Sequence, residues 1–318
     1  MSHPHTPSSI RAVAIMGATA TGKSRLGISI AEEFDGEIIS MDSRQAYRGL
    51  DIGTGKVGAA ERARAPHHLL DTLDIHETGS AGAHIAEAER LIREIAARGR
   101  LPVLVGGTGL YFRALFGGLV PVTIPREELT RIRASVAGRT TPDLYDELRR
   151  RDPARASALS PNDRVRITRA LELITYTGLP VSELYAQPRT GGGDIRYHKL
   201  VLTMPRAALR ARIAERTREL FAAGWIDEVR GLLAQGVAPD APGMQSLGYG
   251  MIAAALVRGG DARACLPGVI TLTQQYAKRQ ETFFRSEKDA VWIDVSAGDA
   301  SARAHAGIAA FLGRAAPQ

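Results

Sequence analysis

Hydrophobic and polar positions in the first third of the chain alternate between short apolar runs and helical patterns. Apolar runs at residues 12–16, 37–41 and 101–105 have the length of buried strands. Residues 25–33 and 83–97 instead repeat apolar side chains at helical spacing. Strands that alternate with helices predict a doubly wound α/β fold with a parallel sheet.

The pattern changes after residue 120. Residues 121–199 predict short helices, one of which opens near Asp163 and closes at Gly178. After a glycine-rich loop at residues 190–193, an apolar run at residues 198–204 predicts a strand that returns to the sheet. Further helices are predicted at residues 207–223, 226–234, 249–257 and 266–284.

Two domains follow from this change of pattern. We expect an α/β core built from residues 1–120 and 200–318, with an α-helical insertion at residues 121–199. The chain shows no internal repeat, and the tail after about residue 295 is rich in Ala and Gly and predicts no particular element.

The first predicted strand runs directly into a glycine-rich loop that matches G-x-x-x-x-G-K-[ST]. Its residues are Gly17, Ala18, Thr19, Ala20, Thr21, Gly22, Lys23 and Ser24. The backbone amides and the following helix N-terminus favour an anion, Lys23 adds a full positive charge, and the Ser24 hydroxyl can hold Mg²⁺. The loop predicts a di- or polyphosphate ligand, without indicating whether that ligand is ATP.

The second strand delivers Asp42 to its carboxyl end, the sheet edge at which such folds place ligands. A carboxylate there suits a general base or an acceptor for an amine. A magnesium ligand and a simple turn cap are the alternatives. Ser43, Arg44 and Gln45 follow as a polar run that suits a second substrate.

The strand at residues 101–105 ends in Gly-Gly-Thr-Gly and carries no acidic residue. Its glycines permit close approach of backbone to a ligand, and Thr108 offers a hydroxyl that both donates and accepts. The missing acid weakens the hydrolase interpretation and favours a transferase whose leaving group is the bound phosphate.

Arginines on two predicted helices are further candidates for anion contacts. Arg166 and Arg169 share the face opposite the apolar stripe of their helix, which suits either a phosphate clamp or a solvated surface. Arg212 and Arg216 are spaced i, i+4 after the return strand, where a cation can reach the phosphate opposite Lys23.

Composition and charge narrow the class of protein. The 318 residues have a net charge of +7, and residues 121–199 hold 14 basic and 10 acidic side chains, a net +4. This basic segment favours a nucleic acid partner, with an arginine-rich composition as the alternative. Cys265 is the single cysteine, and no apolar run approaches the roughly 18 residues of a membrane span. We expect a cytoplasmic monomer without membrane contact.

Eight blocks in this order closely resemble the bacterial tRNA dimethylallyltransferases. They lie at residues 17–24, 41–47, 51–54, 66–71, 105–111, 162–172, 246–249 and 277–285. The resemblance covers residues 11–293 and implies a P-loop fold with an inserted tRNA-binding domain. It also implies Mg²⁺-dependent transfer of a dimethylallyl group from dimethylallyl diphosphate to the exocyclic amine of the adenosine 3′ to the anticodon.

The resemblance also implies roles for particular residues. Lys23, Asp42 and Thr108 would be catalytic, with Asp42 orienting the adenine amine and accepting its proton. The glycine-rich loop and Arg216 would bind the diphosphate. Contacts to the tRNA anticodon arm are implied for Asp42, Ser43, Arg44, Gln45, Thr108, Arg131, Val165, Arg166, Ile167, Thr168, Arg169, Gln245, Ser246, Leu247, Gly248, Tyr249 and Gly250.

Three other functions compete with this one. An isopentenyltransferase acting on free adenine nucleotides has little use for the basic insertion. An ATP-dependent small-molecule kinase requires a pocket for the ATP base. An RNA-binding P-loop protein without catalytic activity leaves Asp42 and Thr108 without a role.

Overall fold

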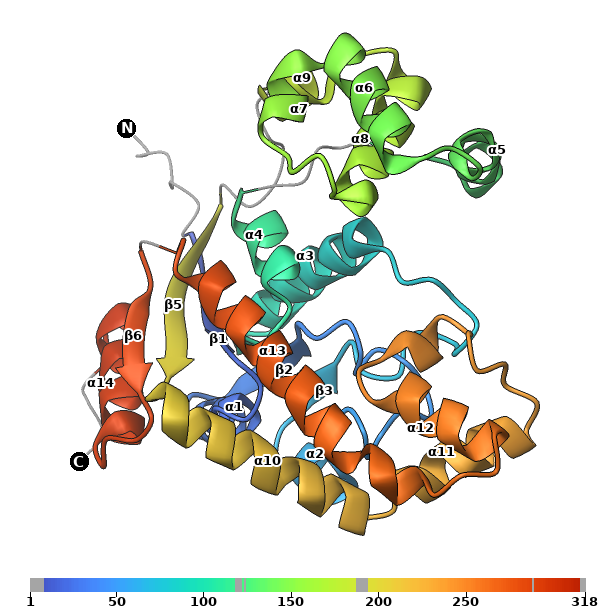
Figure 1. Ribbon diagram of the computed structural model, residues 1–318. Helices are drawn as coiled ribbons and strands as arrows, with labels where there is room; N and C mark the ends of the chain where they lie inside the picture. Colours follow the sequence, from blue (N-terminus) through green and yellow to red (C-terminus); the bar gives the residue numbers. More distant parts are fainter. Residues whose placement is uncertain (1–8, 118–121, 123, 187–193, 288, 315–318) are drawn as a thin grey trace, which may run out of the picture. The chain divides into compact units, whose positions relative to one another are not determined.

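A six-stranded, all-parallel sheet forms the centre of the larger part of the protein (Figure 1). The computed structural model describes residues 9–117, 122, 124–186, 194–287 and 289–314. The chain divides into two compact units, Met1–Leu115 with Gly192–Gln318, and Phe116–Gly191.

The strand order of the sheet is β3-β2-β4-β1-β5-β6. The strands are β1 Ile10–Gly17, β2 Gly36–Ser40, β3 His67–His68, β4 Leu101–Val105, β5 Ile195–Thr203 and β6 Val291–Asp294. Every residue of β2 and β4 is buried, because helices cover both faces of the sheet. The predicted parallel α/β sheet is therefore confirmed.

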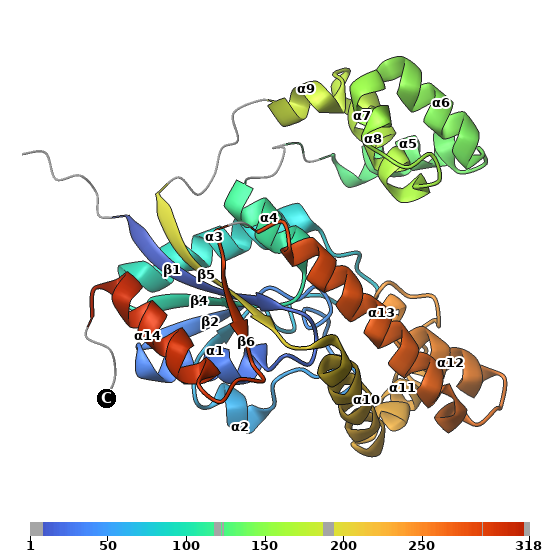
Figure 2. The same ribbon diagram turned by 60° about the vertical axis from the view of Figure 1, so that its left-hand side comes forward.

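Helices of the larger unit lie on both faces of the sheet and beyond its carboxyl edge (Figure 2). They are α1 Lys23–Glu33, α2 Ala59–Arg62, α3 Ala81–Ala97, α4 Gly109–Gly117, α10 Arg206–Ala222, α11 Trp225–Ala234, α12 Tyr249–Val257, α13 Leu266–Phe284 and α14 Ala300–Leu312, with 3₁₀ turns η1 Gly243–Gln245 and η2 Ala262–Cys265. The bounds of α12 and α13 agree with the sequence prediction, and the other predicted elements agree within three residues.

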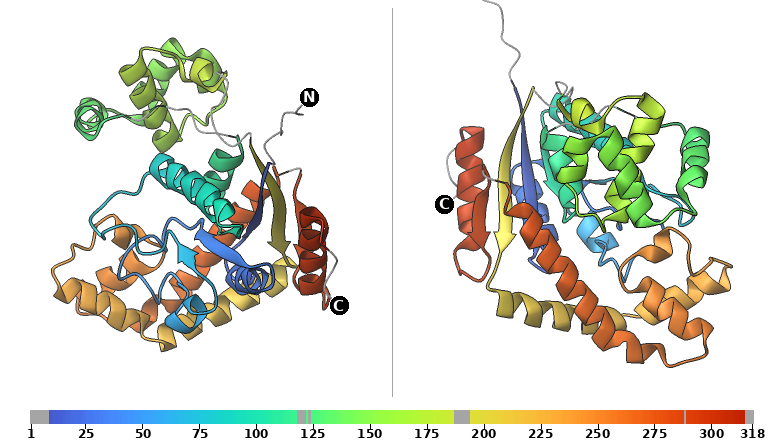
Figure 3. Two further views of the ribbon diagram at one scale, coloured as in Figure 1. Left: turned by 180° about the vertical axis from the view of Figure 1, so that it is seen from behind. Right: turned by 45° about the horizontal axis from the view of Figure 1, so that its top comes forward.

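Two apolar cores organise the larger unit. On one face of the sheet, Val13 and Val103 pack with Ile28 of α1 and Ile308 of α14. Figure 3 shows α14 lying along the strands β5 and β6. A second core joins α11, α12 and α13 through Trp225, Tyr249 and Val269, and it includes Leu50 from the long connection after β2. This second core supports one wall of the pocket described below.

Three of the elements that were not predicted carry little pattern in the sequence. Strand β3 is only two residues long, and Val291 and Trp292 of the edge strand β6 are partly exposed. Helix α14 lies in the Ala-rich tail, where the buried stripe depends on small residues such as Ala304.

The smaller unit is entirely helical in its described residues. It contains α5 Arg126–Val136, α6 Thr141–Arg151, α7 Pro153–Ser157, α8 Arg164–Thr177 and α9 Val181–Ala186 around a core of its own. The Asp163 carboxylate caps α8, and Gly178 ends it in a left-handed conformation, as predicted.

The boundaries of the helical unit differ from the predicted 121 and 199, because residues 195–199 belong to strand β5. The predicted loop at residues 190–193 lies outside the described residues. No described helix is long and apolar enough to cross a membrane.

Candidate active site

The glycine-rich loop connects the carboxyl end of β1 to α1, as the sequence predicts. Gly17 and Gly22 have φ of 144° and 90°, in the region that favours glycine. A Cβ on Gly17 would lie 2.5 Å from the Leu202 carbonyl oxygen, so β5 leaves no space there for a side chain. The two glycines therefore allow the backbone to curl into an anion-binding turn at the start of a helix.

The Lys23 side chain is half-buried, and its ammonium group lies inside this turn. Its Nζ donates a hydrogen bond to the Ala18 carbonyl oxygen at 2.7 Å. Burial lowers the pKa of Lys23 to about 8; the positive charge of Arg216 adds to this shift and the Asp42 carboxylate opposes it. An anion bound in the loop would favour the protonated form of Lys23 and so raise its pKa again, because it would place negative charge beside the ammonium group.

A pocket opens beside the loop, and half of the predicted site residues of the larger unit line it, although Ser43 and Thr108 do not. Its polar lining includes Thr19, Lys23, Ser24, Asp42, Arg44, Gln45, Arg216 and Ser246. Its apolar lining includes Val57, Leu70, Ile213, Leu220 and Leu247. One pocket thus offers cations, a carboxylate and an apolar wall to a ligand.

Asp42 and Thr108 lie together at the carboxyl edge of the sheet. The Asp42 carboxylate accepts a hydrogen bond from the Arg44 N–H at 2.9 Å, and the Thr108 hydroxyl accepts one from the Ser43 N–H at 3.1 Å. The Tyr276 hydroxyl is hydrogen-bonded to Thr108, and burial and the Asp42 charge raise the pKa of Tyr276 to about 12. Asp42 therefore caps a turn and also faces the pocket, so both interpretations of it remain compatible with the geometry.

Of the two candidate arginines on α10, Arg216 reaches the pocket. Its side chain is mostly buried, and burial lowers its pKa, while Asp42 raises it and Arg212 lowers it. Arg216 Nη2 lies 3.5 Å from the Gly55 carbonyl oxygen. Arg212 is exposed and is not among the described lining residues.

Three buried polar atoms on the pocket wall have no hydrogen-bond partner among the described residues. They are Ser40 Oγ, Trp225 Nε1 and Ser246 Oγ. Since buried polar groups are normally paired, these atoms favour a ligand with polar groups of its own.

The donor set suits a magnesium ion that arrives with a phosphate. Mg²⁺ typically takes one or two protein oxygens and completes its shell with phosphate oxygens and water. Ser24 and Asp42 both line the pocket and supply such oxygens. The described residues contain no group of three or more His, Cys, Asp or Glu side chains placed to hold a metal.

Two side chains predicted to contact tRNA are buried instead. Ile167 is fully buried in the core of the helical unit. Tyr249 is fully buried in the second core and donates its hydroxyl to Glu228 at 2.5 Å. Neither side chain is accessible to a tRNA as placed here, because both pack inside apolar cores, and the predicted contact at these two positions stays untested.

The remaining predicted tRNA residues fall into two groups. Around η1, Gln245 is exposed, Ser246 and Leu247 line the pocket, and Gly248 and Gly250 flank the buried Tyr249. In the helical unit Val165, Arg166 and Arg131 are largely exposed, at 80%, 70% and 78%.

Each of the three arginines of the helical unit that are predicted to contact tRNA already has a local acidic partner. Arg166 pairs with Asp163 at 3.2 Å, Arg169 with Glu172 at 3.0 Å and Arg131 with Glu128 at 2.6 Å. Thr168 lies between the two α8 arginines on the same helix and is half-buried. The Arg166 and Arg131 pairs are accessible to solvent and contribute little, whereas the Glu172 carboxylate is buried and also pairs with Arg133 at 2.8 Å. The phosphate clamp stays a prediction.

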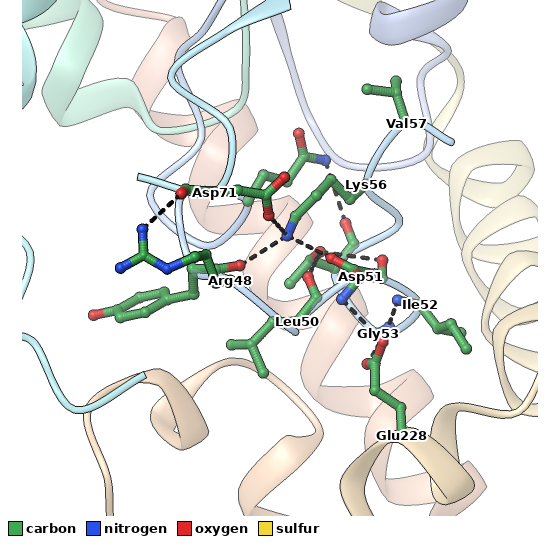
Figure 4. Close-up of polar contacts among 12 residues, drawn as sticks. Arg48, Leu50, Asp51, Ile52, Gly53, Lys56, Val57, Asp71 and Glu228 are labelled. Atoms are coloured by element: carbon green, nitrogen blue, oxygen red, sulfur yellow. Dashed lines mark hydrogen bonds and ion pairs between the residues drawn. The ribbon is translucent and has the colours of Figure 1, made fainter. Parts of the chain in front are cut away.

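Sequence reasoning missed the network that holds the long connection after β2 (Figure 4). Lys56 Nζ is buried and donates to the Tyr47 carbonyl oxygen at 2.7 Å, to Asp51 at 2.6 Å and to Asp71 at 2.5 Å. Gln280 of α13 was missed as well, although it bonds to the glycine-rich loop. Asp51, Asp71 and Gln280 lie inside the blocks that resemble the family, but Lys56 lies outside them, and no local pattern indicates the partners of these residues.

Comparison with known protein families agrees with this geometry. The family model described as IPP transferase matches residues 45–287. A tRNA dimethylallyltransferase of Stenotrophomonas maltophilia K279a is 44% identical over 294 residues, which cover 89% of this chain and 92% of that protein. One of Thiobacillus denitrificans is 45% identical and covers 95% of this chain and 97% of that protein.

Solved structures with a similar fold carry the same kind of name. A tRNA isopentenylpyrophosphate transferase of Bacillus halodurans superposes with a TM-score of 0.65 and 36% identity, covering 90% of each chain. A eukaryotic dimethylallyltransferase described as acting on tRNA has a TM-score of 0.81 and 27% identity, covering 98% of this chain and 81% of that one.

Proposed function

This chain belongs to the IPP transferase family, and we propose that it transfers a dimethylallyl group from dimethylallyl diphosphate to tRNA. The acceptor is the exocyclic N6 amine of the adenosine 3′ to the anticodon, and diphosphate is released. The observation that carries the proposal is the convergence of Lys23, Arg216, Asp42 and an apolar wall on one pocket. The names of the relatives favour tRNA over a free nucleotide as the acceptor.

The glycine-rich loop would hold the leaving group. Breaking the allylic C–O bond leaves the electron pair on a diphosphate oxygen, so negative charge grows there during the reaction. The loop amides, Lys23 and Arg216 would stabilise that charge, and the Thr108 hydroxyl would donate a hydrogen bond to it. Bound Mg²⁺, held by Ser24 or Asp42 together with the phosphates, would supply further charge neutralisation.

Asp42 would act on the acceptor. As N6 of adenine bonds to the allylic carbon, it must lose a proton, and the Asp42 carboxylate, which lines the pocket, would accept it. A stacked adenine cannot enter such a pocket, so the base would be drawn out of the anticodon arm. The apolar side chains, such as Val57 and Leu247, suit the prenyl group.

The tRNA would be held by residues of both units. Near the pocket, contacts would come from Ser43, Arg44, Gln45, Gln245, Ser246, Leu247, Gly248 and Gly250. Arg131 and the first turns of α8, with Val165, Arg166, Thr168 and Arg169, would supply phosphate contacts that set its register.

A transfer assay tests the function directly. The purified protein is incubated with Mg²⁺, dimethylallyl diphosphate and either unmodified tRNA or AMP, and nuclease digests are analysed for prenylated adenosine by mass spectrometry. We expect product with tRNA only. Product with AMP alone would instead identify a free-nucleotide enzyme, and ATP-dependent phosphorylation without prenyl transfer would identify a kinase. The predicted cytoplasmic monomer is tested by fractionation and by light scattering.

A further inference from the structure

The short loop at residues 51–55 is docked onto α11 by a single carboxylate (Figure 4). Glu228 accepts hydrogen bonds from the backbone N–H groups of Asp51, Ile52 and Gly53, at 2.9, 2.7 and 3.2 Å. The Tyr249 hydroxyl donates a fourth bond to it at 2.5 Å. Hydrogen bonds to a charged acceptor are about twice as strong as neutral ones, so this carboxylate fixes three consecutive peptide groups.

Close packing reinforces the hydrogen bonds. A Cβ on Gly53 would lie 2.0 Å from Trp225 Nε1 and 2.6 Å from Tyr249 Cε2, so the loop backbone rests directly on two buried rings. Both rings belong to the second core, whose interior is densely packed. The loop therefore has one well-defined position on α11 and α12.

The opposite side of the same loop faces the pocket. Gly53 and Thr54 line it, and the Thr54 and Gly55 carbonyl oxygens accept from Gln45 Nε2 at 3.4 and 3.3 Å. Arg216 Nη2 lies against Gly55, where a Cβ would come within 2.2 Å of it. The loop thus touches one candidate tRNA residue and one candidate diphosphate residue.

We propose that Glu228 is a positioning residue of the transfer site, which acts through residues 51–55 to hold Arg216 and Gln45 in place. This inference rests on the proposed function for its kinetic effect. Glu228 is not among the described residues that line the pocket, so it would act without touching a substrate. A carboxylate is required, because both oxygens accept two N–H or O–H donors each, and a carboxamide has one oxygen.

The experiment compares Glu228→Gln with Asp227→Asn. Asp227 shares the first turn of α11 and the same charge, but it is exposed and pairs only with Arg230 among the described residues. Binding of inorganic diphosphate, measured by calorimetry, should weaken on the order of tenfold in Glu228→Gln, which matches the loss of one charge-assisted hydrogen bond. Asp227→Asn should bind as the wild type does. The KM values for both substrates should rise, and kcat should fall, in Glu228→Gln alone.

A double-mutant cycle separates positioning from a general loss of stability. If Glu228 acts through the loop on Arg216, Glu228→Gln should weaken diphosphate binding much less in an Arg216→Ala background than in the wild type. Equal weakening in both backgrounds would overturn the proposal. So would a lower melting temperature with unchanged diphosphate affinity and unchanged kinetics in the folded range.

Gly53→Ala provides a second route to the same loop if Glu228→Gln does not fold. Gly53 does not have a positive φ, so alanine changes only the space between the loop and Trp225. It should weaken diphosphate binding in the same way, and unchanged binding would count against the proposal. Diphosphate binding without prenyl transfer in the wild type would refute the proposed function while leaving this test of Glu228 valid.

Discussion

Gln280 of α13 accepts a hydrogen bond from the backbone N–H of Thr19 at 2.8 Å. The same side chain donates from Nε2 to the Gly107 carbonyl oxygen, also at 2.8 Å. One buried carboxamide therefore joins the glycine-rich loop to the strand end that carries Thr108, across 261 and 173 positions of sequence.

Replacing Gln280 with Ala should disturb both segments at once. The change leaves a buried N–H and a carbonyl without partners, which costs about 1–3 kcal/mol for each group left unpaired. We expect a lower free energy of unfolding in urea and a raised KM for dimethylallyl diphosphate. Gln275→Ala, an exposed position on the same helix, is the control and should behave as the wild type. A change in stability without a change in KM would contradict the link to the loop.

Anion binding by the glycine-rich loop should weaken as the pH rises. Burial lowers the pKa of Lys23 to about 8 in the free protein, and a bound anion favours the protonated form. The charged form is therefore complete well below pH 8 and is lost above it, so affinity should fall by up to about tenfold per pH unit above 8.

Calorimetry with inorganic diphosphate between pH 6.5 and 9.5 measures how the affinity depends on pH. This range covers roughly 1.5 units on either side of the pKa of Lys23. A Lys23→Met variant should bind more weakly and should retain only the pH dependence of diphosphate itself. If the two proteins gave parallel profiles, Lys23 would not be the titrating group.

Asp42→Asn separates the general base from a turn cap. An asparagine oxygen can still accept the Arg44 N–H, but a carboxamide cannot accept the adenine proton. Single-turnover prenyl transfer should fall by about 10²–10⁴-fold, the usual contribution of a general base. Affinity for tRNA, measured by filter binding, should stay close to the wild-type value. Unchanged turnover would leave Asp42 with the capping role alone.

The parts of the site that could be predicted are those encoded locally. Strands β1, β2 and β4 each contain a short apolar run, and parallel pairing brings their carboxyl ends to one edge. The meeting of the Lys23 loop, Asp42 and Thr108 follows from that geometry alone. The buried stripe of α8, with Ile167 and Leu171, follows equally from helical spacing.

The contacts that hold the site in place could not be predicted in this way. Glu228 binds residues 51–53 across about 175 positions, and periodicity within a helix carries no information on such distant partners. The burial of Tyr249 could not be predicted either, since the motif that contains it does not show which side faces the core. Long-range pairing is decided by packing of whole elements.

Lys56→Met should destabilise the fold. The buried ammonium pairs with Asp51 and Asp71, whose side chains are 61% and 31% exposed. Water can therefore partly solvate these two carboxylates after the ammonium group is removed. We expect a loss of about 1–3 kcal/mol in urea unfolding, less than for a fully buried pair. The double variant Lys56→Met with Asp71→Asn should regain part of the lost free energy of unfolding. Lys278→Met, at an exposed position of α13, is the control.

The same network predicts an acid-sensitive contribution to stability. Burial raises the pKa of Asp71, but hydrogen bonds from Lys56 and Arg62 outweigh this effect, and the net shift is downward. A carboxyl with a lowered folded pKa stabilises the fold above its unfolded value, near 4, and loses this contribution as the pH falls below it. Unfolding midpoints at pH 3 and pH 6 should therefore differ more in the wild type than in Asp71→Asn.

The paired arginines of α8 give a prediction about tRNA alone. Replacing both Arg166 and Arg169 with Ala should raise the KM for tRNA on the order of tenfold, because two phosphate contacts are lost. The slope of log affinity against log salt should become shallower by up to about two, and the KM for dimethylallyl diphosphate should not change. Arg149→Ala with Arg150→Ala removes the same charge from exposed positions of α6 and should have a smaller effect on both quantities. Equal effects from the two double variants would show that Arg166 and Arg169 contribute only general electrostatic attraction. A change in the KM for dimethylallyl diphosphate alone would refute the phosphate clamp.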